Sequence, residues 1–268
     1  MRFIVVVGPA GSGKSTLTGQ LASLVETLGA SVVKVNFDPA ADRPPYDPDV
    51  DVRQYITAEE FMDKGLGPNG ALVSAIDALI GHVDKMRSEV EEYRPDYVLV
   101  DTPGQLEPFA YRVGGPLVLD ALIQDDKSLT VFLMDAVFFD DPVDIVSILT
   151  LASSVNVRFR RPQLNVISKA DLLPPDFIDD VLPRLHEEGY LEDALRDSRL
   201  LKGLELQLSM NLARALYGAG YIGDVLPVSA YDELSLKELY GKIQQVLEGG
   251  EDYRIYDVDE EQDEEKGG

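Results

Sequence analysis

The stretch "FIVVVGPAGSGKST", residues 3–16, decides the fold class. Its first five residues are all apolar, which is typical of a strand buried on both faces of a sheet. Residues 8–15 then match the pattern G-x-x-x-x-G-K-[ST] at every fixed position, and a helical pattern begins near Lys14. Backbone N–H groups in such a loop wrap a phosphate, which the N-terminus of the following helix also faces. The order strand, loop, helix therefore predicts a nucleotide phosphate site.

Each polar position of this loop has an expected role. Gly11 and Gly13 permit the backbone angles and the close approach that a wrapped phosphate needs. Lys14 is expected to reach the β- and γ-phosphates, and the Ser15 hydroxyl to bind Mg²⁺. The predicted nucleotide-binding residues here are Gly11, Ser12, Gly13, Lys14, Ser15 and Thr16.

Short apolar runs alternate with helical spacing along the rest of the chain. This alternation predicts an α/β fold, namely a P-loop NTPase three-layer sandwich with a mostly parallel sheet and helices on both faces. We expect one domain over residues 1–248, a helical insertion over 176–223 and an acidic, disordered tail over 249–268. The expected strands are 3–7, 31–37, 96–101, 128–135, 163–168 and 224–229, and the expected helices are 14–28, 70–93, 113–124, 142–156, 176–187, 203–217 and 235–247.

Composition narrows the class of protein. There are no cysteines and only two separated histidines, which excludes disulfides and thiolate metal sites. The net charge of −24 opposes direct nucleic-acid binding. No signal peptide or membrane span is evident, so we expect a cytoplasmic protein. The acidic tail is expected to be solvated, with docking on a basic partner as the alternative.

Polar residues follow two further strands, where ligands of parallel sheets bind. Asp101 opens "DTPGQLE", residues 101–107, and is placed to hold Mg²⁺. Gln105 and Glu107 follow and are expected to orient an attacking water. Asp38, in "NFDPAADRPPY", is expected near Mg²⁺ or that water. A strand-end cap for Asp101 and a simple proline-rich connector around Asp38 are the structural alternatives.

Two later strand ends point to guanine. Lys169 and Asp171 lie in "SKAD", similar to the [NT]-K-x-D motif in which an aspartate accepts two hydrogen bonds from guanine. Ser168 stands where the motif has Asn, which weakens the match. Ser229 and Ala230 follow the last expected strand and are similar to a second guanine loop, whose backbone amide meets O6.

The string "DKGLGPNGAL", residues 63–72, is rich in turn-forming residues. Taken alone, it predicts a tight turn before a helix, because Pro68 fixes φ and Asn69 tolerates tight geometry or caps a helix. A rigid loop with small side chains also suits entry into a phosphate pocket. The residues of this string do not decide between these readings.

Together these motifs resemble those of the GPN-loop GTPases, a family in the signal-recognition-particle and septum-site class of P-loop proteins. The resemblance spans residues 8–231 in the family's order, and the Gly67-Pro68-Asn69 triplet is its namesake. It implies a homodimer that hydrolyses GTP to GDP with Mg²⁺. It further implies that the triplet reaches the partner's nucleotide site, where Asp38, Gln105 and Glu107 position water. A role as a nucleotide switch in protein-complex assembly, with an unidentified client protein, is also implied.

Alternatives remain at this point. The loop lacks the extra early lysine of partition-type ATPases, because Pro9 and Ala10 occupy that region. Arg43 and Arg112 are candidates for a cationic finger, with surface ion pairing as the alternative. A P-loop kinase acting on a small molecule or polynucleotide would share the phosphate and Mg²⁺ sites. A metallochaperone GTPase of the nickel-insertion type would need cysteine and histidine ligands, and the sequence has no cysteine and only two isolated histidines. A scaffold that binds GTP without hydrolysis is opposed by Gln105 and Glu107.

The expected insertion, 176–223, is the least explained segment. Leu204, Leu208, Leu212 and Leu216 recur every four residues and are expected to form one apolar face. That face either packs on the parent domain or serves as a surface for a partner.

Overall fold

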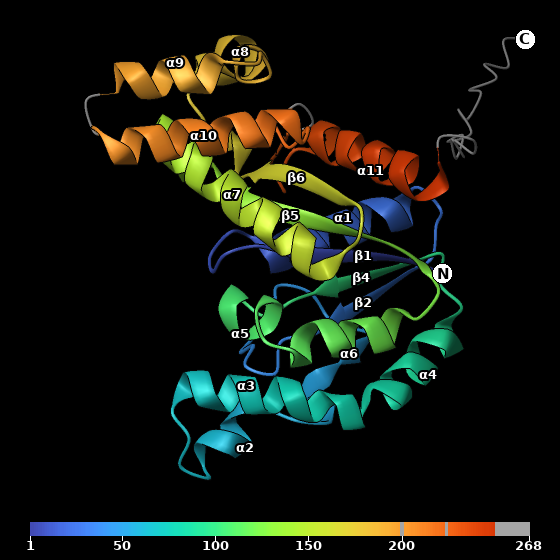
Figure 1. Cartoon of the computed structure of the whole chain (residues 1–268). Helices are drawn as coiled ribbons and strands as arrows, with labels where there is room; N and C mark the ends of the chain where they lie inside the picture. The colour runs from blue at the N-terminus through green and yellow to red at the C-terminus, as the bar shows by residue number, and fades with distance from the viewer. Residues whose placement is uncertain (199–200, 223–224, 250–268) are drawn as a thin grey trace, which may run out of the picture.

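A seven-stranded sheet, ordered β3-β2-β4-β1-β5-β6-β7, organises the chain in the computed structural model, which describes residues 1–198, 201–222 and 225–249 (Figure 1). Every neighbouring pair of strands is parallel. The short β3 was not predicted, since two residues give no periodic pattern. The strands are β1 (Arg2–Val7), β2 (Val32–Asn36), β3 (Val50–Asp51), β4 (Tyr97–Asp101), β5 (Lys127–Asp135), β6 (Gln163–Ser168) and β7 (Leu226–Val228).

Helices cover both faces of this sheet. The apolar faces of α1 and α11 share one core with β1, β4, β5 and β6. The helices α3, α4, α6 and α7 close a second, larger core on the other face. The predicted three-layer α/β class is therefore confirmed. The helices are α1 (Lys14–Thr27), α2 (Ala58–Met62), α3 (Pro68–Ala78), α4 (Val83–Tyr93), α5 (Leu106–Ala110), α6 (Gly114–Ile123), α7 (Pro142–Phe159), α8 (Leu182–Leu185), α9 (Tyr190–Asp197), α10 (Leu204–Gly218) and α11 (Glu233–Glu248).

One expected helix is interrupted. The segment 70–93 forms α3 and α4, separated by a 3₁₀ turn at Leu79–Gly81. Gly81 has low helix propensity, and His82 leaves helical geometry with φ −119°. The His82 ring packs against Tyr55 with centroids 5.5 Å apart, which gives this histidine a packing role.

The segment after β6 is helical and packs on α7 through α9 and α10, and Figure 1 shows α10 running beside α7. It begins with a π-helical turn, Phe177–Val181, followed by α8, α9 and α10. Its expected single leucine face is wrong, because Leu216 is buried while Leu204 and Leu208 are 83% and 61% exposed. A spacing of four residues turns about 40° per step around a helix, so four such leucines sweep across two faces.

Helix α7 alone among the described helices is long and apolar enough to cross a membrane by length and composition. One face of α7, including Ile145, Leu149, Ala152 and Val155, is buried in the larger core. That arrangement is typical of a core helix. The predicted acidic tail lies almost wholly outside the described residues, which end at Gly249.

Candidate functional site

The phosphate loop joins β1 to α1 with the backbone that the glycines predict. Gly11 and Gly13 have φ of 78° and 88°, in the left-handed region that favours glycine. Gly8 is required for a different reason, because a Cβ there would lie 2.6 Å from the carbonyl oxygen of Leu133. The loop is thereby held tightly against β5.

Lys14 is buried at the centre of this loop. Its Nζ donates to the carbonyl oxygens of Gly8 and Pro9, both at 2.9 Å. Burial lowers the pKa of Lys14, against the opposing charges of Asp101 and Asp38. The ammonium group therefore sits between the loop carbonyls and two carboxylates, where a nucleotide phosphate would replace the carbonyls as its partner.

Asp101 ends β4 and is almost completely buried. Its Oδ2 accepts a hydrogen bond from the Tyr46 hydroxyl at 3.0 Å, whereas its Oδ1 is buried and accepts none of normal geometry from the described residues. Burial raises the pKa of Asp101 to about 6, although the nearby Ser15 and Tyr46 hydroxyls and Lys14 oppose this rise.

These oxygens fit a magnesium ion. A buried carboxylate oxygen without a protein partner, beside the Ser15 hydroxyl and the Asp38 carboxylate, is the hard oxygen set that Mg²⁺ prefers. Ser15 and Asp101, with Asp38 directly or through water, would hold the ion. When bound, Mg²⁺ would neutralise charge on the phosphate oxygens.

Asp38 links the segment after β2 to the segment after β4. Its Oδ1 accepts from the Ala40 N–H at 2.9 Å, and its Oδ2 accepts from the Gly104 N–H at 3.4 Å. Burial raises the pKa of Asp38, and these two amides, Lys14 and Arg53 oppose that rise. The contact places Asp38 beside the loop that leads to Gln105.

Tyr46 and Arg53, to which none of the sequence motifs assigns a role, shape the proline-rich segment. Arg53 donates to the carbonyl oxygens of Ala41 and Asp42 at 3.0 and 2.7 Å, and forms a 2.6 Å ion pair with Asp51. These contacts hold the segment on both sides of Tyr46. The sequence gives little indication of this role, because Tyr46 and its partner Asp101 are far apart along the chain.

At the other end of the phosphate loop lies a cavity of about 230 Å³. It brings Lys169, Asp171 and Ala230 together with the phosphate loop, at the ends of β6 and β7. Ser229 does not line this cavity but borders a neighbouring one beside Asp171, and its N–H donates to the Ser235 hydroxyl at 3.2 Å. Other lining residues include Ser12, Gly13, Thr16, Leu17, Val166, Leu172, Val228 and Tyr231.

Lys169 is fixed by a residue that the sequence analysis did not single out. Its Nζ lies 2.5 Å from Asp135 Oδ2, and its own backbone has a positive φ of 58°. Asp135 ends β5 as Asp101 ends β4, so position at a strand end was the available signal. The ion pair holds the lysine stem beside the cavity, where an aliphatic chain can cover a flat base.

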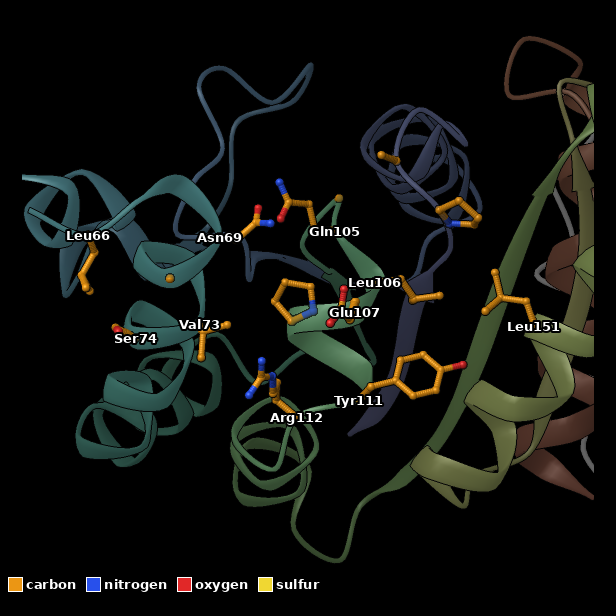
Figure 2. A pocket seen from close by; sticks show the side chains of 15 residues that line it. Leu66, Asn69, Val73, Ser74, Gln105, Leu106, Glu107, Tyr111, Arg112 and Leu151 are labelled. Atoms are coloured by element: carbon orange, nitrogen blue, oxygen red, sulfur yellow. The ribbon is translucent and has the colours of Figure 1, made fainter.

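The Gly67-Pro68-Asn69 triplet starts α3, with Gly67 as N-cap and Pro68 as the first helical residue. It is exposed and borders a larger cavity of about 930 Å³. Figure 2 shows the Asn69 and Gln105 side chains pointing toward one another across this cavity. Glu107, Arg112 and the loop residues Pro9 and Ala10 border it too.

The structure therefore brings the predicted site residues to one edge of the sheet, in two groups on either side of the phosphate loop. Arg112 borders the larger cavity, and Arg43 is exposed outside both cavities. Within the described part of the chain, no cluster of three or more His, Asp or Glu residues forms a further metal site.

Comparisons with known proteins agree with this arrangement. A family described as "Conserved hypothetical ATP binding protein" matches residues 6–249. The chain is 34% identical to GPN-loop GTPase 3 of Dictyostelium discoideum, over 92% of this chain and 87% of that protein. It is 32% identical to GPN-loop GTPase PAB0955 of Pyrococcus abyssi, over 89% and 92%.

A solved structure is also similar. The apo form of the PAB0955 GTPase from Pyrococcus abyssi aligns with a TM-score of 0.79 and 28% identity, covering 91% of this chain and 97% of that one. The relatives named as GTPases extend over nearly the whole chain, including both cavities. The chain therefore belongs to the GPN-loop GTPase family.

Proposed function

We propose that this GTPase is Mg²⁺-dependent and acts as a homodimeric nucleotide switch, with the Gly67-Pro68-Asn69 loop of each subunit contacting the nucleotide of the other. The observation that carries the proposal is the cavity of about 930 Å³ between Asn69 and the phosphate loop. In one chain this cavity opens to solvent, and closing such a site would expel bulk water and strengthen the electrostatic contacts inside it. A second subunit is the partner that would close it.

Charge supports the need for such a partner. Phosphoryl transfer develops negative charge that protein donors must stabilise. Among the residues bordering the cavity, Arg112 is the single cation, and Asn69 offers neutral donors. Lys14 supplies the buried positive charge from the other side. We therefore expect slow turnover that depends on how well Asn69 is positioned.

The roles of the remaining residues follow from their placement. The nucleotide is GTP before hydrolysis and GDP after it, with Asp171 accepting from guanine and the Ala230 backbone facing O6. Gln105 and Glu107 orient water at the cavity edge, and Asp38 holds the Gly104 amide beside them. We propose that opening and closing of this cavity serves protein-complex assembly in the cytoplasm, with a client protein as partner. The similarity to GTPases opposes the kinase alternative.

Mixing two inactive variants tests contact between subunits. In a dimer of Asn69→Ala and Lys14→Ala chains, contact in trans leaves one site with both residues, whereas contact within a chain leaves each site lacking one. Random mixing in equal amounts should then restore about one quarter of the wild-type rate, since half of the dimers are mixed and each has one complete site.

The matched controls are each variant mixed with itself and Lys14→Ala mixed with wild type. Native mass spectrometry would confirm that mixed dimers form. Mixed dimers without recovered GTP hydrolysis would contradict the contact between subunits. If the protein is monomeric at concentrations at which its GTP hydrolysis rate per chain is maximal, the active form is not a dimer.

A further inference from the structure

A groove of about 510 Å³ lies on the face of the sheet that α6 and α7 cover, and it extends to Ser128 near the start of β5. It runs between α6 and the C-terminal end of α7. We call it the arginine groove. Its walls are partly apolar, since Val113 and Leu117 are 78% and 50% exposed. Three arginines border it: Arg158, Arg160 and Arg161.

This concentration of positive charge is unusual in a chain with a net charge of −24. Arg158 donates to the carbonyl oxygens of Ala110 and Tyr111 at 3.1 Å and has no carboxylate partner among the described residues. Arg160 is exposed and likewise forms no ion pair within the described ranges. Arg161 is paired with Asp120. Two guanidinium groups are therefore available to an anionic occupant.

The described chain ends close to this groove. Glu248, one residue before the last described residue, forms ion pairs with Arg2 and Lys127 at the amino edge of the sheet. Lys127 precedes Ser128, whose hydroxyl accepts from Arg161 Nε at 3.1 Å. The last described residue, Gly249, caps the end of α11 on one face of the sheet, whereas α6 and α7 cover the other face.

The chemistry of that following segment complements the groove. Residues 250–268 contain nine acidic and two basic residues. Ahead of most of the acids come Tyr253, Ile255, Tyr256 and Val258, which match the apolar walls. Nineteen residues reach up to about 60 Å when extended, which is ample for one crossing of the sheet edge.

We propose that the acidic segment 251–265 docks in the arginine groove of its own chain. Its carboxylates pair with Arg158 and Arg160, and its aromatic and aliphatic residues cover Val113 and Leu117. Because the segment is tethered beside the groove, its effective concentration is in the millimolar range, so weak individual contacts suffice. Any other acidic chain must displace it to reach these arginines.

The composition of the protein allows a direct test, because it contains neither cysteine nor tryptophan. A fluorophore that tryptophan quenches on contact is attached through Gln262→Cys. Val113→Trp then places a quencher at the groove, while Leu204→Trp places one at an equally exposed position on α10. We expect quenching with Val113→Trp and none with Leu204→Trp.

Arg160→Asn provides the charge test, and Arg94→Asn is its matched control. Both arginines follow the last residue of a helix with a positive φ, 54° and 50°, which asparagine tolerates. Arg160→Asn should reduce quenching about twofold or more, as should about 1 M NaCl, which shortens screening to about 3 Å. Arg94→Asn should leave quenching unchanged.

Three results would overturn the proposal. Absent quenching, or equal quenching at both tryptophan positions, would show that the segment does not dock there. If quenching is unchanged by Arg160→Asn and by salt, the proposed pairing between the acidic segment and the arginines is wrong. Quenching that appears only between a dye-labelled chain and a separate tryptophan chain would assign the groove to the tail of a second copy.

Discussion

The two cavities beside the phosphate loop differ in how completely one chain builds them. The smaller, at Asp171, has a floor of buried residues from β6, β7 and α1, and its lysine is fixed by an ion pair with Asp135. The larger, at Asn69, is bordered by exposed side chains on α3 and α5. Under the proposed function, the base-recognition side is already built by one chain, whereas the hydrolytic side would be completed by a second subunit.

Lys14 lies between the two cavities, so its removal should have the largest effect. Lys14→Ala deletes a charged donor to the phosphates, and losing such contacts weakens binding roughly 100-fold. Titration of a fluorescent GDP analogue measures the change, with the exposed Lys85→Ala as control. If the variant binds the GDP analogue with an affinity close to the wild-type value, Lys14 does not bind the phosphates. The two cavities would then not be parts of one nucleotide site organised around Lys14.

Asp171→Asn should act on the smaller cavity alone. Asparagine offers one oxygen where the carboxylate offers two, so GTP affinity should fall about 10- to 100-fold and base preference should relax toward ATP. Competition between GTP and ATP for the labelled nucleotide provides the measurement. Asp176→Asn, an exposed neighbour, is the control. An unchanged preference for GTP would remove Asp171 from base recognition.

Tyr46→Phe should act on the larger, hydrolytic side. It keeps the ring but leaves Asp101 Oδ2 without its donor, and loss of such a supporting contact typically weakens metal affinity about tenfold. The Mg²⁺ concentration that half-saturates retention of labelled GDP reports this change. Tyr55→Phe, which removes a hydroxyl bonded to Glu89, should leave it unaltered. Equal shifts in both variants would indicate general loosening of the fold.

The smallest expected effect is the pH dependence of Mg²⁺ binding at Asp101, which also concerns the larger cavity. The pKa of Asp101 is raised to about 6, so below that value a proton must leave before Mg²⁺ binds. The half-saturating Mg²⁺ concentration should therefore rise about twofold between pH 8 and pH 6. Without Mg²⁺, the free energy of unfolding should fall as pH rises from about 4 to 7, because the unfolded carboxylate ionises earlier. A flat Mg²⁺ profile would contradict this.

Contiguous motifs predicted much of the site, because a loop such as 8–15 carries its backbone conformation in its own glycines. Strand ends predicted Asp38, Asp101 and Asp171 for a related reason: parallel strands deliver their carboxyl ends to one edge. Tyr46 could not be predicted as a site residue, because its role depends on a hydrogen bond to Asp101, which lies 55 residues later in the sequence.

Helix boundaries and surface faces were harder to predict for a different reason. The break at Gly81 is accompanied by packing of His82 on Tyr55, a contact between residues far apart in the sequence that no local pattern records. The leucine repeat of α10 does not form one face, because a spacing of four residues advances about 40° around the helix at each step. Which of these leucines are exposed, here Leu204 and Leu208, depends on where the neighbouring helices pack, and the sequence pattern does not contain that information.

The central position of β1 has a consequence for how the protein is made. This strand is translated before either of its neighbours, which pair with it from Tyr97 and Lys127 onward. The residues Phe3–Val7, fully buried in the finished sheet, must therefore stay unpaired while about 90 further residues, up to β4, are translated. Such long-range parallel pairing is slow. We expect nascent β1 to need shielding by a chaperone until β4 and β5 have been translated.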